Sequence, residues 1–115
     1  MITLYGIPNC GSVKKARDWL ETQDIAYEFH DFKKLGVDKD TIAGWLKHVG
    51  WEVLVNKKGT TWRGLPEATQ ASVNDAASAT KLMIANPSVI KRPVLCKGKT
   101  VLVGFDAVTY EEHLA

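Results

Sequence analysis

The order in which β-type and helical patterns alternate is the feature that most restricts how this chain folds. A β-favouring run at residues 2–5 ends at Gly6, and apolar residues then recur at helical spacing from Val13 to Leu20. A second β-type run follows at residues 26–32, whereas the middle of the chain carries only helical patterns. The last third returns to strands. This order predicts an α/β sandwich into which an all-helical lobe is inserted.

The helical block is expected to contain two clear helices and, between them, a short helical piece and a short helix or two around residues 66–71. Asp38 or Asp40 is predicted to cap the first helix, whose apolar face is formed by Ile42, Trp45, Leu46 and Val49. The short piece is expected at residues 51–55. Asn74 is predicted to cap the second helix, at residues 75–85.

Turns are expected to separate the remaining elements. Residues 33–36 are predicted to form a turn after the second strand. Strands at residues 94–96 and 101–103 are predicted to form a β-hairpin with a loop of about four residues. Asp106 is expected to cap a final helix.

The composition is that of an ordinary globular domain and excludes several function classes. A net charge of +2 is too small to indicate nucleic-acid binding. Two cysteines without a C-x-x-C pair exclude a disulfide framework and a cysteine-based metal site. The first residues lack the basic and apolar segments of a signal peptide, and no apolar stretch reaches membrane-spanning length. We therefore expect a cytoplasmic protein whose thiols stay reduced.

Cys10 lies where a loop leads into the first helix, which is predicted to end near Gln23. An ordinary thiol is only about 3% ionised at pH 7. The N–H groups of a first helical turn stabilise negative charge, and the small residues Gly11 and Ser12 let those groups approach an anion closely. Lys14 adds positive charge nearby. The pattern favours a reactive thiol, and the alternative is a small buried hydrophobe.

The second cysteine and the segment before it are less clear. Cys96 follows two apolar residues of a predicted strand, which favours a place in the core. It would act as a resolving thiol only if its side chain faced Cys10. Arg92-Pro93 comes immediately before this strand. From the residues alone, Arg92 is as well explained by a solvated loop as by a cation that stabilises a thiolate.

Several motifs together resemble the family of glutaredoxin-coupled arsenate reductases (ArsC), which also contains the Spx transcription regulators. Residues 5–16 (YGIPNCGSVKKA) are similar to its active-site loop, and residues 91–94 (KRPV) to its second signature. Residues 59–63 (GTTWR) and 75–78 (DAAS) resemble the branch usually called YffB. The similarity runs over nearly the whole chain.

The resemblance implies a single thioredoxin-like domain with a mixed β-sheet. Residues 1–37 and 88–115 would form its α/β core, and residues 38–87 the inserted helical subdomain. Cys10 is implied to be the single nucleophile, facing a cis-proline at Pro93, and Arg92 to hold an anion or the thiolate. The implied substrate-binding residues lie in the same two motifs and are Asn9, Gly11, Ser12, Val13, Lys14 and Pro93.

The chain also departs from its relatives. The arsenate reductases grip their oxyanion with three arginines, and only Arg92 is matched here. Asn56 and Lys57 stand near the second position and Gly104 at the third. A lysine does not reproduce the two-pronged guanidinium contact, so efficient arsenate reduction is not expected. Val13 replaces the second cysteine of the C-x-x-C switch that many Spx proteins carry.

These observations predict a glutathione-dependent thiol reductase, with glutathione as co-substrate and no permanently bound cofactor or metal. The expected partners are glutathione, a disulfide or glutathionylated substrate and, as a further candidate, glutaredoxin. A basic rim from Lys14, Arg92 and either Lys57 or Arg63 would suit the carboxylates of glutathione. We expect a monomer that binds neither membranes nor nucleic acid directly. The alternatives are a glutaredoxin-coupled arsenate reductase and a non-enzymatic, Spx-like regulator that binds RNA polymerase.

Overall fold

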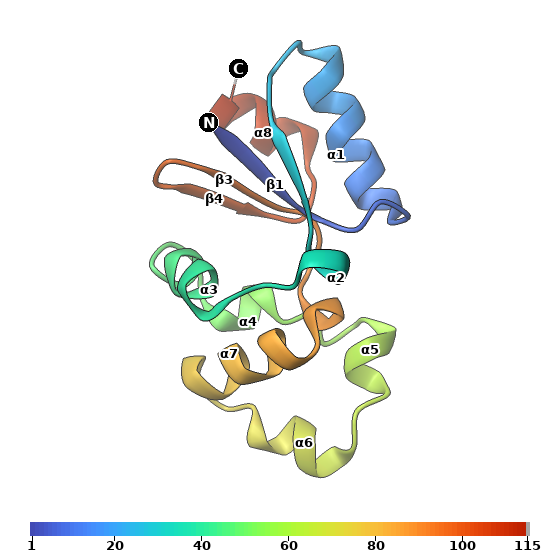
Figure 1. Cartoon of the computed structure of the whole chain (residues 1–115), viewed down its shortest axis with the longest axis vertical. Helices are drawn as coiled ribbons and strands as arrows, with labels where there is room; N and C mark the ends of the chain where they lie inside the picture. Colours follow the sequence, from blue (N-terminus) through green and yellow to red (C-terminus); the bar gives the residue numbers. More distant parts are fainter. Residues whose placement is uncertain (115) are drawn as a thin grey trace. The chain divides into compact units, whose positions relative to one another are not determined.

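A computed structural model describes residues 1–114 and contains one four-stranded sheet in the order β2-β1-β3-β4 (Figure 1). The strands are β1 (Ile2–Gly6), β2 (Glu28–Asp31), β3 (Val94–Lys97) and β4 (Thr100–Val103). β1 pairs with β2 in parallel and with β3 antiparallel, and β3 pairs with β4 antiparallel. The sheet is therefore mixed, as the sequence predicts.

The chain divides into two compact units. Among the described residues, the first unit comprises residues 1–35 and 92–114, and the second comprises Gly36–Lys91. The helices of the first unit are α1 (Gly11–Thr22), α2 (Phe32–Leu35) and α8 (Ala107–Leu114). The second unit is helical and consists of α3 (Lys39–Leu46), α4 (Trp51–Leu54), α5 (Thr60–Arg63), α6 (Glu67–Ser72), α7 (Ala76–Ala85) and the 3₁₀ helix η1 (Pro87–Val89).

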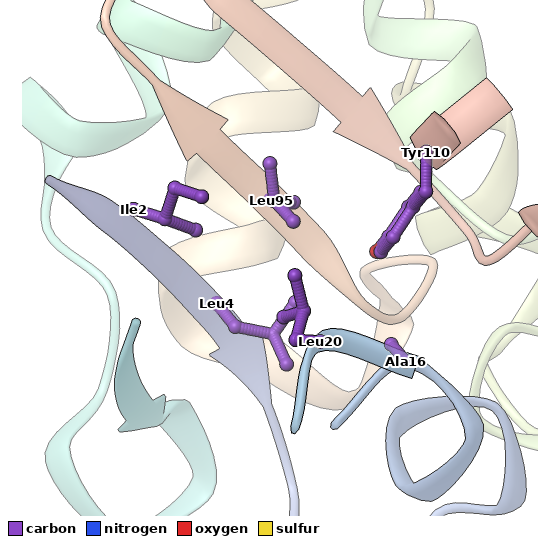
Figure 2. Close-up of a cluster of buried hydrophobic side chains, with 6 residues drawn as sticks. All are labelled: Ile2, Leu4, Ala16, Leu20, Leu95 and Tyr110. Carbon is purple, nitrogen blue, oxygen red and sulfur yellow. The ribbon is translucent and has the colours of Figure 1, made fainter. Parts of the chain in front are cut away.

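The core of the first unit joins the sheet to α1 and α8. α1 connects the parallel strands β1 and β2 (Figure 1), and its residues Ala16 and Leu20 are buried against the sheet. Figure 2 shows the buried cluster, which is formed by Ile2, Leu4, Ala16, Leu20, Leu95 and Tyr110. Because side chains alternate along a strand, Leu4 and Leu95 place α1 and α8 against one face of the sheet.

The second unit is organised around α3 and α7, which pack on each other. Trp45 of α3 and Met83 of α7 are almost fully buried. The Asp38 side chain caps α3 by accepting a hydrogen bond of 2.7 Å from the Thr41 N–H, which decides between the two predicted caps.

The second strand is shorter than the pattern predicts. β2 covers only Glu28–Asp31, and the expected turn at residues 33–36 is replaced by the short helix α2. Phe32, the first residue of α2, is fully buried. The Asp31 carboxylate accepts hydrogen bonds from the Lys33 and Lys34 N–H groups, which satisfies the start of this helical turn.

Two predicted boundaries are also wrong. Asp75, and not Asn74, caps α7, because its carboxylate accepts the Ser78 N–H while the Ser78 hydroxyl accepts the Asp75 N–H. The hairpin loop contains two residues, Gly98 and Lys99, in place of four. Gly98 has φ +57°, a conformation that tight hairpin turns require and glycine adopts readily.

None of the helices within residues 1–114 is long and apolar enough to cross a membrane.

Candidate functional site

Cys10 occupies the N-cap position of α1. Its backbone is extended (φ −100°, ψ 130°), and its side chain makes no capping hydrogen bond. The first bond of the helix runs from the Lys14 N–H to the Cys10 carbonyl at 2.9 Å. The N–H groups of Gly11, Ser12 and Val13 therefore precede the hydrogen-bonded ladder and are available to an anion at this helix end.

The three residues of this first turn differ in how open they are. Gly11 and Ser12 are exposed, and no other group lies within 4 Å of a Cβ placed on Gly11. Val13 is fully buried, so the residue is part of the core and leaves Gly11 and Ser12 as the exposed residues of this turn. Asn9 and Lys14 are exposed on either side, and Cys10 itself is half-buried. The helix end is thus open toward solvent at its first two residues.

Pro93 is the residue immediately before β3. The Arg92–Pro93 peptide bond is cis, Pro93 is buried and Arg92 is half-buried. Val94, the next residue, pairs with Tyr5 of β1. Pro93 therefore lies at the end of the sheet from which β1 leads to Cys10.

Gly104, where the relatives' third arginine would stand, has a backbone role. Its N–H donates a hydrogen bond of 2.8 Å to the Pro93 carbonyl, and its φ is +81°. This conformation favours glycine over an L-residue with a side chain. Position 104 thus holds the proline segment in place and supplies no charge.

Arg92 and Cys10 belong to the same unit and the same end of the sheet. No hydrogen bond or ion pair joins the guanidinium to the thiol within residues 1–114. The role assigned to Arg92 as a stabiliser of the thiolate therefore stays a prediction.

Cys96 lies away from Cys10. It is half-buried on β3 and pairs with Thr3, whose neighbours Ile2 and Leu4 face α1, so Cys96 is on the opposite face of the sheet. Thr3 is also about 10 Å from the end of β1 at a strand rise of about 3.3 Å per residue. A disulfide needs Cα atoms about 4.4–6.8 Å apart. This fold therefore keeps Cys96 from resolving Cys10, and the expected core position of Cys96 is wrong.

The second unit contains an arrangement that the sequence did not reveal. The Lys57 Nζ lies 5.3 Å from the ring centroid of Trp51 and 5.4 Å from that of Trp62. Both distances fit cation–π contacts, which hold the end of an otherwise mobile lysine. Trp62 is buried, whereas Arg63 beside it is exposed. The two tryptophans are six and five residues from Lys57, a spacing that gives no recognisable signal.

Within the part of the chain that the structure describes, no group of three or more His, Cys, Asp or Glu side chains is placed to hold a metal ion.

Comparisons with known proteins identify the family. The ArsC family model matches residues 5–113. A Haemophilus influenzae protein described as uncharacterised is 40% identical over 115 residues, which cover the whole of both chains. The global transcriptional regulator Spx of Streptococcus mutans is 27% identical over 92% of this chain and 77% of its own length.

Solved structures agree with this result. A protein described as YffB is 46% identical with a TM-score of 0.95, and the match covers all of both chains. An arsenate reductase (ArsC)-related protein from Brucella melitensis is 52% identical with a TM-score of 0.75, over 97% of this chain and 92% of that chain. These likenesses confirm the thioredoxin-like fold and the YffB-type resemblance. The chain belongs to the ArsC family.

Proposed function

We propose that this protein is a glutathione-dependent thiol reductase that works through Cys10 alone. The observation that carries the proposal is the isolation of Cys10 at the open N-terminus of α1. The other cysteine lies on the opposite face of the sheet and near the far end of β1. A reductase with one reachable cysteine needs an external thiol to complete its cycle, and glutathione is the thiol that fits this role.

The reaction consists of two thiol–disulfide exchanges. The Cys10 thiolate attacks the glutathione sulfur of a glutathionylated substrate, which forms a Cys10–glutathione disulfide and releases the substrate thiolate, which then takes up a proton. A second glutathione, as thiolate, attacks the glutathione sulfur of this disulfide. Oxidised glutathione leaves and the Cys10 thiolate is restored. One glutathionylated thiol is reduced and two glutathione moieties end as one disulfide, so the electrons balance.

Groups on the first unit suit the recognition of glutathione. Lys14 is exposed on the first turn of α1, and the half-buried Arg92 offers a guanidinium to a carboxylate. The Lys91 N–H donates to the Leu54 carbonyl and the Pro93 carbonyl accepts from Gly104. The Arg92 N–H and carbonyl between them enter no backbone hydrogen bond within residues 1–114. They are available to pair with the peptide backbone of a thiol substrate.

Lys57 and Arg63, the further candidates for this recognition, belong to the second unit, and their part in binding glutathione stays a prediction.

A coupled assay tests the proposal. The purified protein is given a glutathionylated peptide, glutathione, NADPH and glutathione reductase, and NADPH consumption is followed. Cys10→Ser should abolish turnover, while the matched variant Cys96→Ser should keep it within about two-fold, because Cys96 takes no part in either exchange. Full activity in Cys10→Ser, or loss of activity in Cys96→Ser with an intact fold, would overturn the single-cysteine scheme.

Glutaredoxin-coupled arsenate reduction is the second candidate, favoured by the 52% identical relative described as arsenate reductase-related. It would use the same thiol, with arsenate bound at the α1 amides and Arg92. One observation speaks against this candidate. The Gly104 N–H donates a hydrogen bond to the Pro93 carbonyl, and position 104 supplies no guanidinium to bind arsenate. Arsenate-dependent NADPH consumption with glutaredoxin, glutathione and glutathione reductase separates the two activities.

A regulatory role is the third candidate, because Spx regulators are among the relatives. Val13 stands three residues after Cys10, so a C-x-x-C disulfide is not available to switch such a regulator. Binding of purified RNA polymerase by wild type and Cys10→Ser alike, without thiol reductase activity, would favour this role.

A further inference from the structure

α3 and α7 enclose a groove that the proposed chemistry does not use. All of its lining residues belong to the second unit, and its volume is about 290 Å³. On α3 the lining residues follow one another at i, i+4 and i+7, and on α7 at i, i+3, i+4 and i+7. The lining consists of Lys39, Ala43 and Leu46 on α3 and of Ala77, Thr80, Lys81 and Ile84 on α7.

The floor and walls of this groove are apolar although they face solvent. Ile84 is 42% exposed, whereas Leu82 and Met83 beside it on α7 are buried in the core of the unit. Ala43 and Ala77 are exposed, and their small side chains leave the hollow between the helices. The groove side of α7 thus carries the apolar residues Ala77 and Ile84 outside the core, and apolar groups that gather at a solvent-facing groove are typical of a contact surface.

The two charged residues that line the groove are both lysines. Lys39 lies at the first position of α3 and Lys81 in the middle of α7, and both are exposed. No acidic residue is part of the lining. The long stems of lysines pack along apolar surfaces while their ammonium groups stay in water, so the two residues extend the groove and present positive charge at its edge.

We propose that the α3–α7 groove docks an acidic amphipathic helix of a partner protein. A helix seats apolar side chains spaced three or four residues apart in a groove between two helices, and glutamates beside them meet Lys39 and Lys81.

The surface of α8 carries apolar and acidic side chains of the kind that would fit the groove. A second copy of this chain is therefore the main alternative to a partner protein. Val108 is 63% exposed, and Glu111 and Glu112 follow it at i+3 and i+4, both exposed. α8 of a second copy would therefore present one apolar side chain with two carboxylates one turn further along the helix. Self-association of this protein has to be measured beside partner binding.

A titration with designed helical peptides tests the proposal on the full chain. The probe peptide carries leucines at helical spacing on one face with glutamates beside them, and the control peptide carries lysines in place of the glutamates. The ¹⁵N-labelled protein should bind the acidic peptide, and the largest amide shifts should fall on Ala43, Thr80 and Ile84. Lys39→Glu/Lys81→Glu should weaken binding by about ten-fold or more and make the basic peptide the better ligand.

Two further variants complete the experiment. Ile84→Glu should abolish binding without unfolding the protein, because Ile84 is partly exposed already. Lys34→Glu, a matched charge reversal on α2 outside the groove, should leave the affinity within about two-fold. Sedimentation of each variant measures self-association.

Three results would overturn the proposal. The first is the absence of peptide binding, or binding with shifts outside α3 and α7. The second is tighter binding of a medium-chain fatty acid than of the acidic peptide, which would make the groove a small-molecule site. The third is a dimer that Lys39→Glu/Lys81→Glu dissociates and that Glu111→Lys/Glu112→Lys in the same chain restores, which would assign the groove to a second copy.

Discussion

Gly6 and Val13 meet where β1 ends and α1 begins. A Cβ placed on Gly6 would lie 2.6 Å from Val13 Cγ2, closer than two carbon atoms tolerate. Val13 is fully buried and β-branched, so it has little freedom to turn away. The missing side chain at Gly6 therefore sets how closely α1 approaches the sheet, and with it the place of Cys10.

We predict that Gly6→Ala pushes the first turn of α1 outward. The free energy of unfolding should fall by about 1–3 kcal/mol, as is typical when a packed core is overfilled. The alkylation rate of Cys10 should fall as well, because its helix end moves. Urea denaturation and iodoacetamide kinetics measure the two effects.

A double-mutant cycle assigns this effect to Val13. In Gly6→Ala/Val13→Ala the added methyl occupies space that the truncated valine leaves, so the double variant should lose less stability than the sum of the two single variants. Additive losses would show that the crowding does not involve Val13.

Tyr110 is the second residue whose packing leads to a prediction. Its hydroxyl is buried and has no hydrogen-bond partner among residues 1–114, while its ring packs edge-on against Trp19 and Phe105. Tyr110→Phe keeps the ring contacts and removes the unpaired hydroxyl. We expect the free energy of unfolding to rise by about 1–2 kcal/mol. A loss of stability would mean that the hydroxyl is satisfied in solution.

The same residue predicts an alkaline limit to stability. Burial raises the pKa of Tyr110 well above its ordinary value of 10.0, so the folded protein keeps this proton where the unfolded chain releases it. Above about pH 10 the unfolded state binds fewer protons, and the free energy of unfolding therefore falls as the pH rises. Urea denaturation at pH 9 and pH 11 should show a smaller fall in Tyr110→Phe than in wild type. Equal falls would remove Tyr110 as the cause.

Asp75, the N-cap of α7, predicts a loss of stability at acidic pH. The Ser78 N–H and then the Ser78 hydroxyl donate hydrogen bonds to its carboxylate, which lower the pKa of Asp75 below 3.8. The stabilisation is present above pH 3.8 and is lost as the pH falls through the lowered pKa. Asp75→Ala should lower Tm at pH 7 and have little effect at pH 2. Asn74→Ala is the matched control and should leave Tm unchanged, because the Asn74 side chain caps nothing.

Local sequence patterns predict some elements of this fold and not others. The helix after Cys10 and the strand before it are local, and their periods are read directly from Val13, Ala16 and Leu20. The helix α2 is not predicted by a local pattern, because its formation depends on the burial of Phe32 by residues that are distant in the sequence. Adjacent Asn74 and Asp75 are equally good caps by type, so the sequence alone does not distinguish between them.

The site itself is only partly encoded locally. The motif around Cys10 predicts a cysteine at a helix N-terminus, and the structure places it there. Two other features depend on how distant segments fold together, and a local pattern does not predict them. Cys96 is separated from Cys10 by the register of β3 on β1, and the Lys57 contacts with two tryptophans depend on how α4 and α5 fold.

Arg92 provides a test of the electrostatics at the site. If its guanidinium stabilises a thiolate at Cys10, Arg92→Ala should reduce the thiolate absorbance at pH 7 and slow alkylation, while Arg92→Lys should keep part of both. Lys91→Ala, a neighbouring exposed cation, is the control. Unchanged absorbance and alkylation in Arg92→Ala would show that Arg92 does not stabilise a thiolate at Cys10.

The central claim is that Cys10 alone exchanges disulfides with glutathione, and intact-protein mass spectrometry after incubation with oxidised glutathione tests it most directly. The account predicts one glutathione adduct per chain, mapped to Cys10, formed equally in Cys96→Ser, absent in Cys10→Ser and removed by reduced glutathione. A chain that gains no adduct, or gains it at Cys96, would contradict the account.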